Sequence, residues 1–283
     1  MDLLSQLNAA MRYVEAHLDD DIALGDASSV TSYSPYHFGR LFYYIAGISL
    51  SEYIRRRKLS LAGAELQAGS ARVLDLAVKY GYDSADSFSR AFAKQHGVTP
   101  TAARRPGVTL KIFSPLTFQI KVQGAEEMNW RIEEREAFEV AGIKRFFLNG
   151  ESGNISAWWT ETRENGSQAK LTEQLGRSGL IGVCECADGR DDGFDYMIGL
   201  PVCAGDNTDG CTVVNVPRTT FAVFRSDEIR GYGQQIPELF SRAYSEWLPS
   251  SGYTKADGAD MEIYGADDKG KLYEEVWIPV KKQ

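Results

Sequence analysis

The stretch 73–105 places the strongest constraint on how this chain folds, because it contains two short helical patterns on either side of a glycine. An apolar run opens the stretch, and Gly81 follows it where a helix C-cap needs a left-handed residue. Ser84 stands where an N-cap belongs, and Phe88 and Phe92 recur behind it at helical spacing. Two short helices joined by a tight turn predict a helix-turn-helix.

The second predicted helix has a polar face suited to DNA. Its phenylalanines point to the core, and its N-terminal end is the part that enters a major groove in such motifs. The candidate DNA contacts on this face are Ala85, Asp86, Ser89 and Arg90. A plain helical domain would show the same order of helix, glycine and helix, so the pattern alone leaves both interpretations open.

The segment GYDSADSFSRAFAKQHGVTPTAARR resembles the signature of the AraC/XylS family of transcription regulators. Upstream, SPYHFGRLFYYIAGISLSEYIRRRKLSLAGAEL resembles the first helix-turn-helix of the same family, followed by a long joining helix at 50–67. The resemblance implies two units, about one turn of DNA apart, that read successive major grooves. The candidate DNA contacts of the first unit are Tyr36, Gly39 and Arg40.

Charge is distributed unevenly along the chain, whose net charge is -8. Residues 1–107 carry a net charge of +1 and residues 108–283 a net charge of -9. The first part must therefore rely on local arginine placement to bind DNA, and the acidic part suits a cationic or neutral small ligand. The basic run 55–58 lies on the long helix, where a solvated face is favoured over phosphate contact.

Length and composition suggest two globular domains without a membrane partner. The chain has 283 residues, and no apolar run approaches the roughly 18 residues of a membrane span. The N-terminus lacks the pattern of a signal peptide, so we expect a cytoplasmic protein. All four cysteines lie in the second half without a paired CxxC or a nearby histidine, so we expect neither a metal nor a cofactor.

The hydrophobic period changes from helical to two after residue 107, which predicts domains at 1–107 and 128–283 and a linker at 108–127. The second domain repeats a strand-helix-strand-strand pattern. Its first copy has strands at 130–147, 180–187 and 194–202 and a helix at 155–165; its second has strands at 212–225, 260–266 and 271–280 and a helix at 234–248. The fold class is an all-α N-terminal double helix-turn-helix domain plus an α+β C-terminal domain with helices on one face.

Alternation along the last predicted strand sorts its residues onto two faces. Glu275 and Trp277 share the face away from the helices, which we expect to form a ligand cleft opposite Met197 and Gly199. A carboxylate beside an indole suits a flat cationic or amphipathic molecule. Glu274 takes this place if the register slips by one, and a merely solvated Glu275 is the plain alternative. Candidate aromatic walls are Trp158, Trp159, Tyr196, Tyr264, Tyr244 and Trp247.

The second domain also resembles the GyrI-like effector-binding domains of Rob-like and BmrR-like regulators. The resemblance lies in FEVAGIKRF, AWW, YMIGLPV, EWLPSSGY, MEIYG and YEEVWIPV. It implies a small-molecule effector site with a glutamate in the last strand as the ligand-binding acid. Some similar domains are hydrolases, so the fold alone does not exclude an enzyme.

Together these features predict a bacterial transcription regulator that is not an enzyme. Its expected partners are a double-stranded DNA operator, a small-molecule effector and RNA polymerase. Two alternatives remain open. One is a GyrI-like hydrolase with an attached DNA-binding domain, which would use Glu275 and a tyrosine as acid and base. The other is a module that sequesters a protein partner on its acidic sheet.

Overall fold

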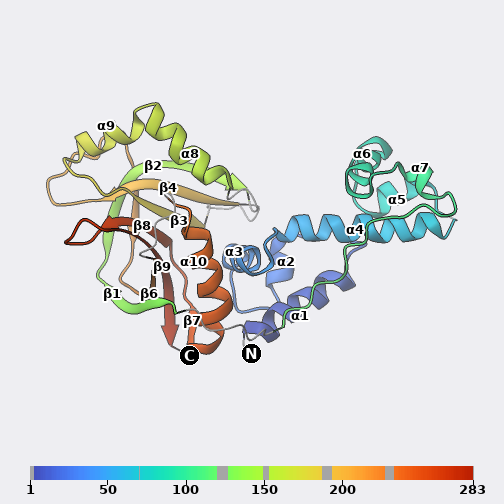
Figure 1. The fold of residues 1–283 in the computed structure, drawn as a ribbon, viewed down its shortest axis with the longest axis horizontal. Helices are drawn as coiled ribbons and strands as arrows, with labels where there is room; N and C mark the ends of the chain where they lie inside the picture. Colours follow the sequence, from blue (N-terminus) through green and yellow to red (C-terminus); the bar gives the residue numbers. More distant parts are fainter. Residues whose placement is uncertain are drawn as a thin grey trace. The chain divides into compact units, whose positions relative to one another are not determined.

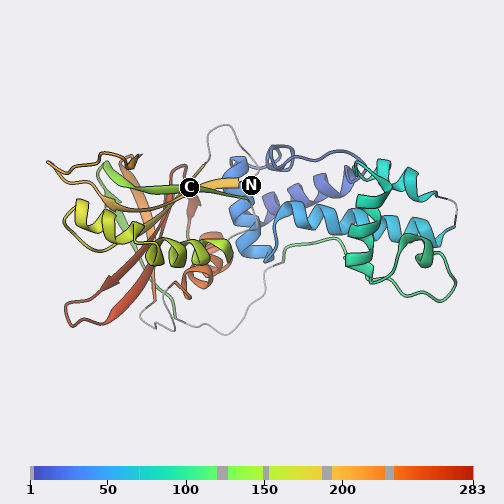
Figure 2. The same ribbon diagram turned by 90° about the horizontal axis from the view of Figure 1, so that it is seen from above.

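The computed structural model describes residues 3–69, 71–119, 127–148, 153–186, 193–226 and 233–282. The chain forms two compact units, whose elements Figures 1 and 2 show from two directions. The first unit comprises residues 1–35 and 48–120, and the second comprises residues 36–47 and 121–283. This division differs from the predicted domains, because residues 36–47 group with the second unit and the segment from 108 to 119 groups with the first.

The first unit is helical, as the sequence predicts. Its described helices are α1 (Leu3–Ala16), α2 (Leu24–Ser28), α4 (Leu50–Gln67), α5 (Val73–Lys79), α6 (Ala85–His96) and α7 (Pro100–Ala103). Helix α6 begins after Ser84, whose hydroxyl accepts a hydrogen bond of 3.1 Å from the backbone N–H of Ser87. It ends at Gly97 in the left-handed conformation, with φ of 77°.

The predicted core of the helix-turn-helix formed by α5 and α6 is confirmed. Phe88 and Phe92 of α6 are fully buried and pack with Leu76 of α5 and Leu59 of α4. Between the two helices Gly81 has φ of 76°, which a residue with a side chain rarely adopts. The turn and the packed apolar face therefore hold α6 with its polar face outward.

Residues 108–119 of the predicted linker are part of the first unit, residue 127 is part of the second, and residues 120–126 lie outside the described ones. Residues 108–119 form no strand, contrary to their alternating pattern. Instead, their backbone bonds to helical side chains: Phe113 N–H donates to the Ser60 hydroxyl at 2.9 Å, and Leu116 N–H donates to the Tyr53 hydroxyl at 3.0 Å. These bonds satisfy backbone groups that a strand would satisfy in a ladder.

The basic run on α4 is only half solvated. Arg57 donates two hydrogen bonds of 2.8 and 2.7 Å to Glu15 and a third, of 2.6 Å, to the Phe113 carbonyl. Lys58 donates to the Asp20 carbonyl at 2.7 Å. Both cations are buried, so the predicted solvated face is wrong for them. Arg57 connects α4 to α1 and to the segment 108–119, and Lys58 connects α4 to the residues just after α1. These two cations therefore do not form part of a free basic patch.

The second unit contains a sheet of nine strands among its described residues, in the order β1-β6-β9-β8-β3-β4-β2-β5, with β7 paired to β9. The strands are β1 (Asn129–Arg135), β2 (Phe138–Leu148), β3 (Ile181–Cys186), β4 (Gly193–Pro201), β5 (Thr212–Val216), β6 (Thr219–Ser226), β7 (Tyr253–Lys255), β8 (Asp260–Ala266) and β9 (Leu272–Lys282). Its helical segments are α3 (Pro35–Ala46), α8 (Gly153–Glu164), α9 (Ser167–Gln174), α10 (Ile236–Arg242), η1 (Ala243–Trp247) and η2 (Leu248–Ser250). The predicted α+β class is confirmed.

Each long strand predicted at the start of a repeat is two strands. The break after Arg135 separates β1 from β2, and the break at Pro217 separates β5 from β6. In both cases the two pieces lie in different halves of the sheet, because β1 pairs with β6 whereas β5 pairs with β2. The two repeats therefore exchange strands, and they form one continuous sheet through the pairing of β3 with β8.

The strand register sorts the sheet residues onto two faces. Glu262 lies opposite Val276, and Met261 lies opposite Trp277, so neighbouring residues of β8 and β9 alternate between faces as predicted. Helix α8 packs on the face of Tyr196 and Cys184. The other face holds an apolar core that includes Val140, Val183, Met197, Phe221, Met261 and Trp277. That face is filled by side chains, contrary to the predicted cleft.

None of the helices in the described ranges is long and apolar enough to cross a membrane. Within the same residues, no group of three or more His, Cys, Asp or Glu side chains is arranged to hold a metal ion.

We expect Arg57→Ala to lower the free energy of unfolding by about 2 kcal/mol, because it removes the cation paired with Glu15, which keeps only its hydrogen bond from Tyr53, and the donor to the Phe113 carbonyl. Urea unfolding of the full chain, followed by circular dichroism at 222 nm, measures this change. The matched control is Arg55→Ala, which removes a half-exposed cation paired with Glu52 on the same helix. It should cost less than about 0.5 kcal/mol. Equal losses in both variants would show that the Arg57 contacts stabilise the protein no more than the ion pair of Arg55 with Glu52 does.

Candidate functional site

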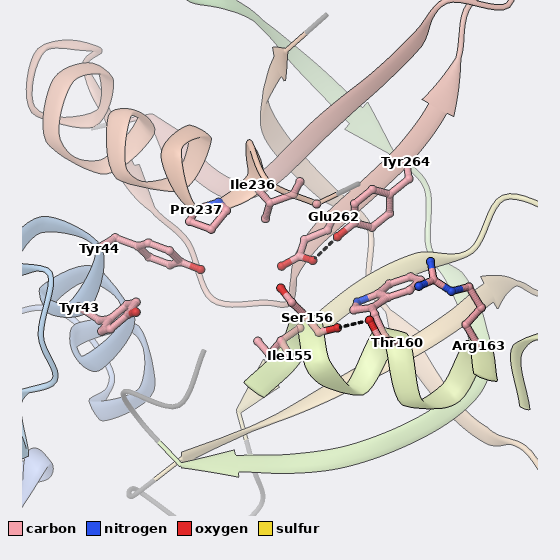
Figure 3. A pocket seen from close by; sticks show the side chains of 12 residues that line it. Tyr43, Tyr44, Ile155, Ser156, Thr160, Arg163, Ile236, Pro237, Glu262 and Tyr264 are labelled. Atoms are coloured by element: carbon pink, nitrogen blue, oxygen red, sulfur yellow. Dashed lines mark hydrogen bonds between the residues drawn. The ribbon is translucent and has the colours of Figure 1, made fainter. Parts of the chain in front are cut away.

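A pocket of about 380 Å³ lies in the second unit, between helices α3, α8 and α10 and strand β8 (Figure 3). It is on the face of the sheet that the helices cover. Its lining residues are Tyr43, Tyr44, Ile155, Ser156, Trp159, Thr160, Arg163, Gly233, Ile236, Pro237, Glu262 and Tyr264. Apolar and aromatic groups surround a small number of polar ones, as is typical of sites for small organic molecules.

Glu262 is the acidic residue of the pocket. It is 5% exposed, and its Oε2 accepts hydrogen bonds from the hydroxyls of Tyr196 at 2.5 Å and Tyr264 at 2.8 Å. The Tyr196 hydroxyl in turn accepts one from Trp159 Nε1 at 2.9 Å. Burial raises the pKa of Glu262, although the hydrogen bonds from the two tyrosine hydroxyls and the charge of Arg40 favour its charged form. The side chains that donate hydrogen bonds to this carboxyl group among the described residues are two neutral tyrosines.

Strand alternation and a glycine place Glu262 where it is. Asp260, Glu262 and Tyr264 are spaced by two in β8, so all three point to the helical face. Gly182 lies opposite Glu262 in β3. A Cβ atom on Gly182 would lie 2.9 Å from Glu262 Oε2 and would overlap the Tyr196 hydroxyl. Because Gly182 has no side chain, there is room for the hydrogen bond between the Tyr196 hydroxyl and the Glu262 carboxyl group.

Aromatic rings form much of the pocket wall. Trp159 and Tyr264 meet edge to face, with ring centroids 5.2 Å apart. Figure 3 shows Tyr43 and Tyr44 on the α3 side, with Glu262 and Tyr264 on the sheet side. Aromatic faces and a carboxylate shielded from water both attract an organic cation. Arg163, on α8, adds a positive group to the lining.

The structure places the predicted acid, Glu275, outside this pocket. Its carboxylate pairs with Arg131 Nη1 at 2.8 Å and accepts a hydrogen bond from Trp277 Nε1 at 2.9 Å. It lies on the face opposite Glu262, because it is paired with Ile263 in the register. The competing candidate, Glu274, is on the helical face, where its carboxylate accepts hydrogen bonds from the backbone N–H groups of Gly233 and Gln235.

The other predicted ligand residues divide into two groups. Trp159 and Tyr264 line the pocket, and Tyr196 supports Glu262 from behind it. The other predicted residues lie outside the pocket. Trp158 packs against Phe147 and Tyr196, and Met197 and Trp277 belong to the core of the opposite face. Gly199 lies close to the β2 residues Val140 and Ala141. Of the other candidate walls, Tyr244 bonds to Asp260 and Trp247 packs on Phe224.

Sequence reasoning missed Glu262, the pocket contribution of α3 and the pocket residues of α10. One usable signal was present: Glu262 stands two residues before Tyr264, which was a predicted wall, so both had to share a face. For Tyr43 and Tyr44 the sequence contains no such signal, because their helix follows the pattern of a DNA-binding unit.

The two sets of predicted DNA contacts differ in exposure. On α6, Asp86 and Arg90 are about three-quarters exposed and form an ion pair of 2.8 Å. Ala85 and Ser89 lie on the same helix, where the Ser89 hydroxyl donates to the Ala85 carbonyl. On α3 the contacts Tyr36, Gly39 and Arg40 are all buried within the second unit. The predicted outward face of α3 is therefore wrong in this structure.

Arg40 explains the burial of α3. Its Nε donates to Asp260 Oδ2 at 3.1 Å, and both side chains are almost fully buried. Lys255 Nζ lies 3.2 Å from the other oxygen of the same carboxylate. Burial disfavours the ionised form of Asp260, but the charges of Lys255 and Arg40 outweigh this effect and lower its pKa.

Comparison with known proteins identifies both parts of the chain. Residues 27–106 match the family model of a helix-turn-helix domain of the AraC type. The Right origin-binding protein of Escherichia coli strain K12 is 34% identical over 105 residues, which are 37% of this chain and 36% of that protein. The HTH-type transcriptional activator AarP of Providencia stuartii is 35% identical over 100 residues, which are 35% of this chain and 74% of that protein. The chain thus spans about a third of the first relative.

Solved structures resemble about half of the chain. SAV2435 bound to tetraphenylphosphonium is 21% identical, with a TM-score of 0.46, over 54% of this chain and 94% of that one. An integron cassette protein of Vibrio cholerae is 19% identical, with a TM-score of 0.41, over 54% and 95%. Residues 131–280, which are more than half of the chain, match the model of the integron-associated effector binding protein. The chain belongs to this family of effector-binding proteins, and it carries an AraC-type helix-turn-helix domain before the effector-binding domain.

Proposed function

We propose that this protein is a transcription regulator that binds an operator through α6 and an organic cation in the pocket around Glu262. One observation carries the ligand proposal: a buried carboxyl group faces an aromatic pocket, and the hydrogen bonds it receives come from tyrosines. The family of the second unit supports an effector site there.

A cation suits this pocket for an electrostatic reason. Burial makes ionisation of Glu262 less favourable than in water and raises its pKa. A positive ligand that enters the pocket would favour the charged carboxylate and would meet the faces of Trp159 and Tyr264. The volume of about 380 Å³ fits a small drug-sized molecule. Arg163 would hold the charged end of such a ligand toward Glu262, because like charges repel.

The DNA proposal rests on α6. The helix is held in a helix-turn-helix by a buried core, and its N-terminal polar face is exposed. Arg90 has the geometry to donate two hydrogen bonds to guanine, and Asp86 to accept from cytosine. The relatives of this region include the transcriptional activator AarP, which supports a promoter site and RNA polymerase as the further partner.

Binding is favoured over the two alternatives. A hydrolase built on the same pocket would use Glu262 with Tyr264 or Tyr196, whose hydroxyls both bond to one carboxylate oxygen. That arrangement fixes the carboxyl group, and the matched family is one of effector binding. A protein-sequestering module needs an open face, whereas Glu262 lies in a recess and is 5% exposed.

We expect Glu262→Gln to weaken binding of tetraphenylphosphonium to the full chain by about tenfold, because it removes a charge and keeps the shape. This cation has a permanent charge and several phenyl rings, so its own protonation does not confuse the measurement. Isothermal titration calorimetry measures the dissociation constant. The control is Glu275→Gln, which removes a buried carboxylate on the opposite face of the sheet and should leave binding unchanged. The site lies elsewhere if the control is the damaging change or if neither variant matters.

We expect Arg90→Ala to reduce affinity for a duplex selected from a random library by about tenfold, with a smaller loss on unselected DNA, because a bidentate contact to guanine is worth about 1–3 kcal/mol. Fluorescence anisotropy at fixed salt measures both affinities. The control is Arg72→Ala, since Arg72 forms a similar exposed ion pair with Asp75, outside α6. Equal losses on selected and unselected DNA would mean that Arg90 contacts phosphate alone.

A further inference from the structure

Helix α3 carries two conflicting sets of properties. It lies within the segment 27–106 that matches the helix-turn-helix family, and its pattern is that of a DNA-reading helix. Yet residues 36–47 group with the effector-binding unit. The side chains that would contact DNA, Tyr36 and Arg40, are 5% and 6% exposed. A helix cannot present these residues to a major groove and bury them at the same time.

The burial of α3 has an ionic centre. Arg40, Asp260 and Lys255 form a buried cluster in which both cations contact one carboxylate. The Tyr244 hydroxyl donates a further hydrogen bond of 3.2 Å to Asp260. Beside them, burial and the charge of Lys255 lower the pKa of His37 to about 4, so this residue of α3 is neutral near pH 7. Buried charges demand close matching of partners, so this contact specifies one docked position of the helix.

Aromatic packing extends the contact along α3. Tyr44 stacks on Phe240 with ring centroids 4.8 Å apart, and its carbonyl accepts a hydrogen bond of 3.1 Å from Ser241 of α10. The guanidinium of Arg40 lies 5.1 Å from the ring centre of Phe240 and 5.4 Å from that of Phe194. The docked helix thus combines an ion pair with stacking, and both involve the face that would contact bases.

The same helix completes the pocket. Tyr43 and Tyr44 are lining residues, across the pocket from Glu262 (Figure 3). A ligand that fills the pocket therefore contacts α3 in its docked position. Without Tyr43 and Tyr44 in this position, the pocket would lack one wall. A ligand with contacts in only one of two states shifts the equilibrium toward that state.

We propose that α3 has two alternative partners, the effector-binding unit and a DNA major groove, and that a bound effector holds it on the effector-binding unit. The direction of coupling rests on the proposed effector site, whereas the competition between the two partners does not. The coupling between the two ligands is reciprocal. The effector lowers the affinity of α3 for its half-site in the operator by a certain factor, and DNA bound to α3 lowers the affinity of the protein for the effector by the same factor. The regulator without effector then contacts both half-sites, and the regulator with effector contacts only the half-site of α6.

The test uses the full chain and two duplexes selected for binding, one with both half-sites and one in which the half-site for α3 is scrambled. Asp260→Asn removes the charge that holds Arg40. Without any ligand, it should raise affinity for the intact duplex by on the order of tenfold and leave affinity for the scrambled duplex unchanged. Glu275→Gln is the control, because it removes a buried carboxylate whose partner is Arg131 on β1, and it should change neither affinity.

Tetraphenylphosphonium supplies the ligand arm. Saturating amounts should lower the affinity of the unchanged protein for the intact duplex by on the order of tenfold, and should have a smaller effect on Asp260→Asn. Phe240→Leu is a second variant that weakens the stacking on Tyr44 and the ring contact of the Arg40 guanidinium, while it keeps the charged groups of Arg40, Asp260 and Lys255. It serves if Asp260→Asn fails to fold, and it should also raise affinity for the intact duplex.

Each outcome decides a separate point. Unchanged affinity for the intact duplex in the folded variants, without ligand, overturns the competition between the two partners. A rise in affinity on adding tetraphenylphosphonium overturns the proposed direction of coupling. If this cation fails to bind the unchanged protein at all, the proposed effector site is wrong, and the comparison without ligand still decides whether α3 exchanges partners.

Discussion

The second unit depends on how it accommodates buried carboxylates in two neighbouring strands. Asp260 and Glu262 of β8 and Glu274 and Glu275 of β9 are each at most 5% exposed. A buried carboxylate is costly unless other groups compensate its charge or bond to it. Among the described residues, Asp260 has two cations, Glu275 has an arginine, and Glu274 has two backbone N–H groups. Glu262 has tyrosine hydroxyls, which bond to it without neutralising it.

This difference among the four acids separates structural from functional roles. Asp260, Glu274 and Glu275 have compensating groups within the protein. We therefore expect their substitution to affect stability and the position of neighbouring elements. Glu262 faces a pocket instead, where the proposed cationic ligand would place a positive charge against it. The same comparison connects the site to α3, because Asp260 and Glu262 are on one face of one strand. The residue that holds the helix and the residue offered to the ligand are thus neighbours in β8.

Much of the fold could be predicted from the sequence, because local signals determine it. Ser84 and Gly97 mark the ends of α6, and the long helix α4 has the predicted bounds of 50–67. The alternation of β9 correctly separates Glu275 and Trp277 from Val276. Alternation defines two faces, however, and does not say which of them holds a pocket. Both faces of β8 and β9 are buried, so the alternation gives no ground for preferring the face of Glu275 to that of Glu262, and the packing of α8 and α10 decides which face holds the pocket.

The placement of α3 shows where local patterns end. Arg40 and Asp260 are 220 residues apart in the sequence, and nothing near Arg40 indicates a carboxylate partner. A guanidinium requires hydrogen-bond acceptors, and both a carboxylate and a guanine edge supply them. The sequence around Arg40 therefore indicates that this residue will bind hydrogen-bond acceptors. It does not indicate whether those acceptors belong to a carboxylate of the protein or to a guanine base. A helix with such a residue on its outward face suits more than one partner, and the choice between them depends on tertiary contacts and on the occupancy of the pocket beside it.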